Sequence, residues 1–167
     1  HSEIQAAIRT TLLADADIAA VLPSDRLKIQ KKPWSRNQKW KAGAFICQLR
    51  RDKPQFENEI ALTICPVLVS LIWPSDGSLI ANQDVESALM ERIEQIFEWK
   101  ARTKAPAPLL ALDALHTGAN QYTFQRCTVS PGEPFVDGAF RDGFDALACV
   151  VTVEIISVIT NERTLGA

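Results

Sequence analysis

The chain has 167 residues, of which 47% are apolar and 23% charged, and its formal net charge is −2. This is the composition of a folded globular protein, and it excludes an intrinsically disordered chain. The length suits one hydrophobic core, so we expect a single domain over residues 1–167. No apolar run approaches the roughly 20 residues of a membrane-spanning helix, so we expect no membrane partner.

Charge is unevenly distributed along the chain. Residues 1–53 carry 11 basic and 5 acidic side chains, residues 54–104 carry 4 and 8, and residues 105–167 carry 3 and 7. A basic first third can serve nucleic-acid binding. It can equally serve a protein whose basic side docks on the acidic side of its own copy. The charge distribution leaves both readings open.

The residues that most often carry chemistry are sparse. The four cysteines, Cys47, Cys65, Cys127 and Cys149, are far apart and lie in strand-like segments. This favours buried reduced thiols over disulfides or a reactive thiol. His116 stands alone, and no nucleotide-binding, zinc-protease or nucleophile-elbow motif occurs. We therefore expect no catalytic residues, no cofactor and no metal, and we predict that the protein is not an enzyme.

Residues 1–22 are expected to be helical. The S-x-x-Q spacing of a capping box opens the chain and is followed by apolar residues at helical spacing. This pattern predicts a helix that ends near Leu13 or Ala14. Asp15 or Asp17 is then expected to cap a short second helical turn.

Residues 23–43 are expected to form an extended basic loop, with a short strand over Leu27 and Ile29. The segment contains seven basic side chains, one acidic side chain and two tryptophans. Basic residues interleaved with Trp suit a surface that contacts phosphates and bases. We favour the alternative, in which the tryptophans pack on the core or on a neighbouring subunit. The interface residues expected in this loop are Lys31, Lys32, Trp34, Arg36, Lys39 and Trp40.

Residues 44–51 and 59–73 have strand patterns, and their adjacency predicts a β-hairpin. In the second strand, apolar residues alternate up to Ile64 and then follow the opposite parity from Val67. A proline lies between the two runs, and proline cannot donate to a β-ladder. We therefore expect a register break or bulge at Pro66.

A helix is expected to start near Asn82, because the apolar spacing becomes helical after the strand. Leu89 and Ile93 are expected to pack against Val151 and Val153 of the last strand. The outer face of the helix carries acidic side chains that should be solvated or meet a partner's basic side, namely Glu91, Glu94 and Glu98.

The last third is expected to return to strands. Residues 105–115 contain two prolines that end the helix, followed by a short apolar segment. Strands are expected from Tyr122 to Val129 and over residues 145–158, the latter at the sheet centre because it is long and β-branched.

Between these strands lies a long loop over residues 131–143, of a length that is usually functional. Its acidic residues lack the spacing of a calcium loop. The residues of this loop expected at an interface are Phe135, Asp137, Phe140 and Arg141.

These elements predict an α+β fold, with a mixed, mainly antiparallel β-sheet, an N-terminal helix and one long helix packed on the sheet. Their order resembles that of the tail terminator (tail-completion or neck) proteins of long-tailed bacteriophages. The resemblance lies in the N-terminal helix running into ADADIAAVL, the hairpin of AFICQLRR and EIALTICPVLVSLIWP, the helix DVESALMERIEQIF and the final strand CVVTVEIISV.

The resemblance implies a virion structural protein of the tail or neck, assembled in the host cytoplasm. Members of this family form a hexameric ring that caps the tail tube protein and presents a surface to the head-tail connector protein. A ring is a closed set of contacts between two different patches on identical copies, and the basic and acidic segments supply such patches. Some basic residues of the 23–43 loop can instead line the lumen, in transient contact with passing DNA.

Two other functions are consistent with the sequence. The chain could be a head-tail connector or a minor tail protein, which a pattern of elements does not distinguish from a terminator. A function of another class is a monomeric nucleic-acid-binding module that uses the basic segment 26–41.

Overall fold

The computed structural model describes residues 2–21, 27–29, 43–48, 55–57, 60–75, 77, 80–115, 122–133 and 144–158. A six-stranded sheet forms the centre of the fold, with strand order β1-β2-β4-β6-β5 and with β3 also paired to β4. The strands are β1 (Leu27–Ile29), β2 (Gly43–Gln48), β3 (Gln55–Glu57), β4 (Ile60–Pro74), β5 (Tyr122–Gly132) and β6 (Phe144–Val158). β1 is parallel to β2, and all the other pairings are antiparallel.

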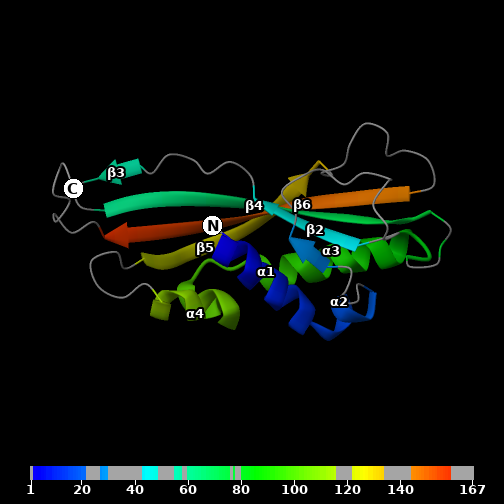
Figure 1. The fold of residues 1–167 in the computed structure, drawn as a ribbon, viewed down its shortest axis with the longest axis horizontal. Coiled ribbons are helices and arrows are strands. Elements are labelled where there is room, and N and C mark those ends of the chain that lie inside the picture. The colour runs from blue at the N-terminus through cyan, green and yellow to red at the C-terminus, as the bar shows by residue number, and fades with distance from the viewer. Residues whose placement is uncertain are drawn as a thin grey trace.

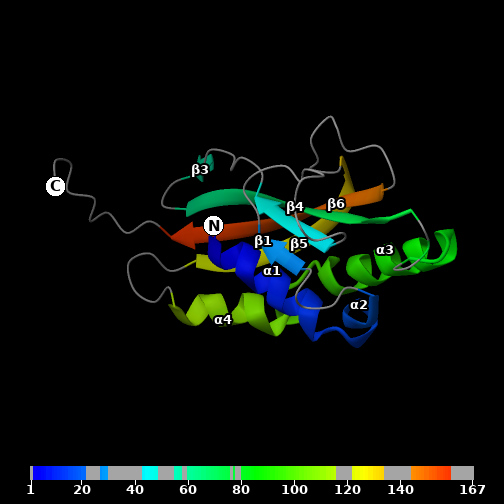
Figure 2. The ribbon, with the colours of Figure 1, turned by 45° about the vertical axis from the view of Figure 1, so that its right-hand side comes forward.

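The helices lie together on one face of this sheet (Figures 1 and 2). They are α1 (Ser2–Ala14), α2 (Ala16–Val21), α3 (Gln83–Phe97), the short 3₁₀ helix η2 (Arg102–Lys104) and α4 (Ala107–Leu115). The expected fold class is confirmed: α+β, a mixed and mainly antiparallel sheet, an N-terminal helix and one long helix. No helix in the described part of the chain is both long and apolar enough to cross a membrane.

β4 and β6 are the longest strands, and they pair along their whole length. The register runs from Ile60 opposite Val158 to Pro74 opposite Phe144, without a shift. The expected break at Pro66 is therefore wrong. On its other side, β4 pairs with β3 up to Leu62 and with β2 from Val67, so Pro66 falls between the two partners. At this gap the missing N–H of proline removes no bond to either described strand.

The change of apolar parity in β4 has a simpler cause, because both faces of the strand are covered. Val67, Val69 and Leu71 belong to the core on the helix side, while Leu68 and Ile72 are also buried, on the opposite face. A strand that is buried on both faces reads as a continuous apolar run.

The one register shift in the described sheet lies in β5, between Phe124 and Arg126. Phe124 pairs with Ile155 and Cys127 with Val153, so the bulge turns both side chains toward the helices although they are three residues apart. Both are fully buried. In a regular strand, two residues that are three positions apart point to opposite faces. The bulge places Phe124 and Cys127 on the same face.

α3 is the helix that the sequence predicts to pack on the sheet. It begins as expected after Asn82, whose side-chain oxygen accepts a hydrogen bond from the Val85 N–H at 3.1 Å. Its buried residues are Leu89, Ile93 and Phe97, and they share one core cluster with Val151 and Val153 of β6, among others. This confirms the packing of helix and last strand that the sequence predicts.

Residues 105–115 contain a helix that the sequence reading missed. α4 follows Pro106, whose carbonyl accepts hydrogen bonds from the N–H groups of Leu109 and Leu110. Pro108 lies in the first turn, where a missing N–H leaves no helical bond unmade. α3 ends at Phe97 and η2 at Lys104, both before Pro106, so the expectation that the two prolines end the long helix is wrong. The prolines instead lie at the start of a new helix, and Leu109 is fully buried in the core.

Candidate assembly surface

The ten residues predicted to form a subunit interface or lumen all lie outside the described residues. They are Lys31, Lys32, Trp34, Arg36, Lys39, Trp40, Phe135, Asp137, Phe140 and Arg141. Their role therefore remains a prediction. His116 also lies outside the described residues, so the expectation that it has no catalytic role remains a prediction as well. The described residues nevertheless form charged and grooved surfaces.

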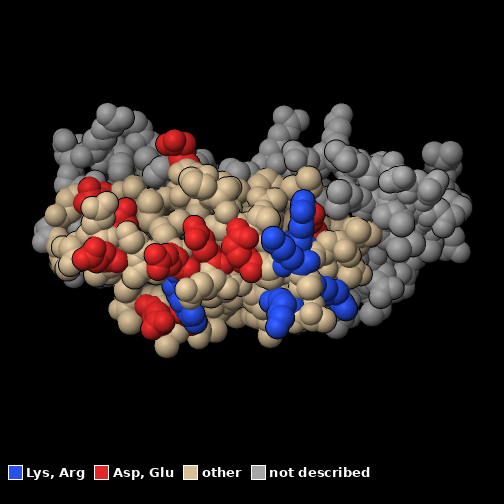
Figure 3. Space-filling model, turned by 180° about the vertical axis from the view of Figure 1, so that it is seen from behind, with Lys and Arg blue, Asp and Glu red and all other residues tan. Residues whose placement is uncertain are grey.

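The solvent side of α3 is acidic. Glu91, Glu94 and Glu98 are all exposed, as predicted, and Asp84 in the first turn is exposed as well. In Figure 3, acidic side chains form a row across the left and centre of the molecule. Aligned carboxylates of this kind create a negative potential that attracts a basic partner.

A basic cluster lies beside this row. It consists of Lys100, Arg102, Lys104 and Arg126, all of them exposed. Most of the blue side chains gather to the right of the acidic row in Figure 3, and one lies below the row. Arg126 also forms a cross-strand ion pair with Glu154, at 2.7 Å between Nε and Oε1. Charges of opposite sign are therefore segregated on one face of the molecule.

The turn between α1 and α2 is tied to α3 through Asp15. Its Oδ1 accepts hydrogen bonds from the N–H groups of Asp17 and Ile18, both at 3.1 Å, so Asp15 caps α2 as one of the two predicted candidates. Its Oδ2 accepts from Arg92 Nε at 2.9 Å and Nη2 at 2.6 Å. The hydrogen bonds from Arg92 are the main reason that the pKa of Asp15 is lowered below its ordinary value of 3.8.

Next to this ion pair, α2 and α3 enclose an open groove of about 430 Å³. Its apolar wall consists of Val21, Val85, Ala88 and Leu89, and its polar rim of Asp17, Glu91, Arg92 and Gln95. Only Leu89 among the apolar four is fully buried, while Val21 and Val85 are partly exposed and Ala88 is exposed.

Part of this groove is visible in the sequence pattern. Val85 and Ala88 belong to the apolar stripe that predicts α3, but periodicity does not reveal that part of the stripe remains uncovered. The long-range contact of Arg92 with Asp15, 77 residues apart, has no local sequence signature.

The outer edge of β5 is closed by the segment that follows α3. Trp99 N–H donates to the Cys127 carbonyl at 3.2 Å, and Cys127 N–H donates back to Trp99 at 2.8 Å. Two residues further along, Val129 N–H donates to the Glu98 carboxylate at 2.6 Å. Pro131 has no N–H to offer. This stretch of edge therefore offers little to an added strand.

Trp99 itself is buried, and its indole N–H has no hydrogen-bond partner in the described structure. The cysteines whose side chains are described, Cys65, Cys127 and Cys149, are all buried. Burial raises the pKa of the Cys149 thiol to about 12 and raises that of Cys127 further. Thiols of this kind stay protonated and unreactive, which agrees with their predicted role as small apolar residues.

Among the described residues, no group of three or more His, Cys, Asp or Glu side chains is placed to hold a metal ion. A second hollow, lined by Trp73, Ile80, Asn82, Glu86 and Asp145, among others, opens near the start of α3. It is mostly polar, and its two carboxylates disfavour an anionic ligand at the helix N-terminus.

No protein-family model and no curated protein matches the chain. Among the solved structures that match, one is a chain of a particle described as "Virion of native gene transfer agent (GTA) particle". The two chains are 14% identical, the match covers 93% of each, and the TM-score is 0.43.

Proposed function

We propose that this chain is a structural virion protein of a phage-type particle, a non-catalytic tail terminator or neck component that acts as a homo-oligomeric ring. The observation that supports this most is the element order of the fold. An N-terminal helix, an antiparallel pair from β2 and β4, the helix α3 and the terminal pair β5 and β6 follow the order on which the sequence resemblance rests.

The charged surfaces support a ring in a second way. A closed ring needs two unlike patches on each copy. The exposed face of α3 is acidic, whereas residues 23–43 carry seven basic side chains and one acidic side chain. In this proposal the ring caps the tail tube protein and presents its other side to the head-tail connector protein, with DNA passing through the lumen.

Electron microscopy of particles that lack this protein tests the role. A terminator stops tail growth, so its absence should give overlong tails. A connector or joining protein instead predicts filled heads without tails beside free tails of normal length. Normal particles in its absence would contradict both roles.

A monomeric nucleic-acid-binding module is the competing function, favoured by the Trp-containing basic segment 26–41. Such a module would remain a single copy in solution, and its affinity for DNA would fall steeply as salt rises, because binding releases counterions from the phosphates. A ring of about six copies supports assembly, and a monomer with salt-dependent DNA affinity supports the module.

A further inference from the structure

We propose that the groove between α2 and α3 receives the basic, tryptophan-containing segment 31–41 of a second copy of this chain. This inference rests on the proposed ring function and specifies the contact that would build the ring. In this proposal the acidic patch that faces the basic segment is the groove, and Phe135, Asp137, Phe140 and Arg141 are not needed for the contact.

The wall of the groove suits an aromatic side chain. Four apolar side chains, Val21, Val85, Ala88 and Leu89, line one continuous hollow of about 430 Å³. This is within the roughly 300–1,000 Å³ that small-ligand pockets occupy. Tryptophan is the residue most enriched among those that dominate binding energy, particularly where it fills a pocket with an apolar wall. Trp34 and Trp40 are the two tryptophans of segment 31–41.

The rim of the groove suits a basic segment. Asp17 and Glu91 are exposed at the rim, and the side chain of Asp17 is 82% exposed. Arg92 is the one cation among the described lining residues, and its charge is offset by Asp15 at 2.6 Å and by Asp17 at 3.8 Å. Asp84 and Glu94 on the same helix extend the acidic surface. Residues 31–41 carry five basic side chains and no acidic one.

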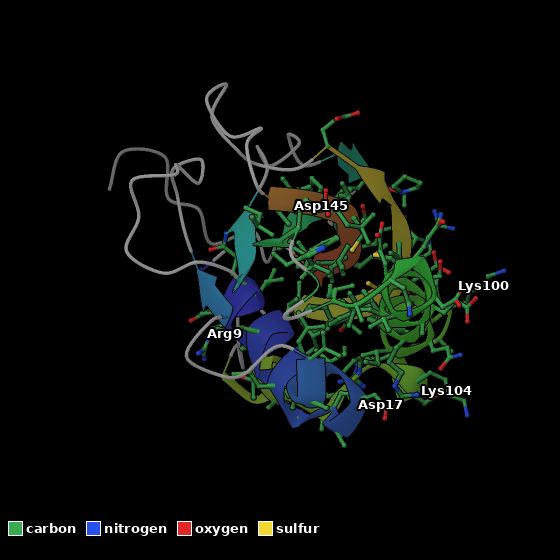
Figure 4. All side chains as sticks on the ribbon, turned by 90° about the vertical axis from the view of Figure 1, so that its right-hand side faces the viewer. Arg9, Asp17, Lys100, Lys104 and Asp145 are labelled. Carbon is green, nitrogen blue, oxygen red and sulfur yellow. The ribbon has the colours of Figure 1, made fainter. Side chains whose placement is uncertain are left out.

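The placement of the strands favours a contact between copies. Residues 30–42 connect β1 to β2, which lie together at one edge of the sheet. In Figure 4, β1 and β2 lie on the left of the molecule with Arg9, whereas α3 and Asp17 lie on the right. A contact between two unlike patches on identical copies is heterologous, and it produces a ring when the rotation closes.

The test compares two variants at neighbouring exposed positions of α3. Ala88→Arg adds a long cation inside the groove, whereas Ser87→Arg adds the same charge at a residue that does not line it. Both variants should fold, because Arg is a good helix former. Measured by native mass spectrometry, Ala88→Arg should be a monomer and Ser87→Arg should remain a ring.

Mixing a segment variant with the groove variant identifies which part of the chain occupies the groove. Trp34→Ala/Trp40→Ala should also be a monomer, because it lacks the inserting residues but keeps its groove. An equal mixture with Ala88→Arg, which keeps its segment, has one productive contact and should give a 1:1 dimer. A second segment variant, with Lys31, Lys32 and Lys39 changed to Glu, keeps the tryptophans and should behave in the same way even if the Trp variant folds poorly.

The outcomes separate this inference from the proposed function. A wild-type ring that Ala88→Arg leaves intact, or that Ser87→Arg disrupts equally, overturns the groove while the ring stands. A mixture that stays monomeric although both single variants are monomers means that another segment, or the chain's own segment, fills the groove. A wild-type monomer overturns the ring and this contact together.

Discussion

The C-terminal end of α3 and the side of α3 that faces α2 meet the rest of the chain in different ways. At the C-terminal end, Trp99 exchanges two backbone hydrogen bonds with Cys127, and Glu98 accepts the N–H of Val129. On the side that faces α2, Arg92 binds Asp15 in the turn before α2, but an open groove with a partly exposed apolar wall remains along α3 from Val85 to Gln95. The C-terminal end is completed within the chain. The groove offers surface to a partner, and our proposal locates assembly there.

Ile93→Asp should disrupt both of these regions of α3, and it has the largest expected effect. Ile93 is fully buried in the core between helix and sheet. An unpaired buried carboxylate costs several kcal/mol, comparable to a total stability of about 5–15 kcal/mol. We expect the loss of soluble protein on expression.

Ser87→Asp is the matched control, since it places the same carboxylate at an exposed position of the same helix. Its stability should stay within about 0.5 kcal/mol of the wild type. A soluble Ile93→Asp variant with an unchanged melting temperature would mean that α3 does not lie on the sheet.

Two substitutions of Asp15 distinguish the two interactions that it makes beside the groove, namely the cap of α2 and the ion pair with Arg92. Asp15→Ala removes both the cap of α2 and the partner of Arg92, and we expect it to lower the free energy of unfolding by about 1–3 kcal/mol. Asp15→Asn keeps a capping oxygen and loses the charge, so its loss should be roughly 1 kcal/mol or less, because Arg92 is partly exposed. Chemical denaturation measures both losses. Equal losses in the two variants would mean that the cap contributes nothing.

The same carboxylate makes stability depend on pH. Its pKa is lowered in the folded protein, mainly by the hydrogen bonds from Arg92, so its contribution is fully present above the unfolded value near 3.8. The contribution is lost as pH falls through the lower, folded pKa. The difference in unfolding free energy between wild type and Asp15→Asn should therefore be constant near neutral pH and shrink below pH 3.8. A difference that grows on acidification would contradict the assigned ion pair.

Substitutions of Glu98 test the contact between the C-terminal end of α3 and β5, and they have the smallest expected effect. Glu98→Ala leaves the exposed Val129 N–H without its 2.6 Å acceptor, and should destabilise the protein by about 0.5–1.5 kcal/mol. Glu98→Gln retains an acceptor and should lose less. Hydrogen exchange at Val129 should speed up in the Ala variant. Unchanged protection there would show that the carboxylate does not close this edge.

Local sequence patterns predicted most of the fold. Alternation and helical spacing located β4, α3 and β6, and the capping residues Asp15 and Asn82 were visible as short polar side chains before apolar periods. The errors arose where one local signal has two structural meanings. Pro66 can mark a bulge or a gap between neighbouring strands, and Pro106 can end one helix or begin another.

The assembly surface was less accessible to sequence reasoning, for a physical reason. The acidic outer face of α3 follows from periodicity, because charged residues on a helix occupy the side away from the core. The groove does not follow, since it depends on how α2 lies against α3, where Arg92 binds Asp15 at long range in the sequence. Sequence alone supplied the basic segment and the acidic face of α3, but not the groove.

The mass of the purified chain in solution, measured by native mass spectrometry or sedimentation over a range of concentrations, tests the central claim most directly. Our account predicts a closed assembly of about six copies that grows no further as concentration rises. A species that remains a single copy at the highest concentration would contradict it.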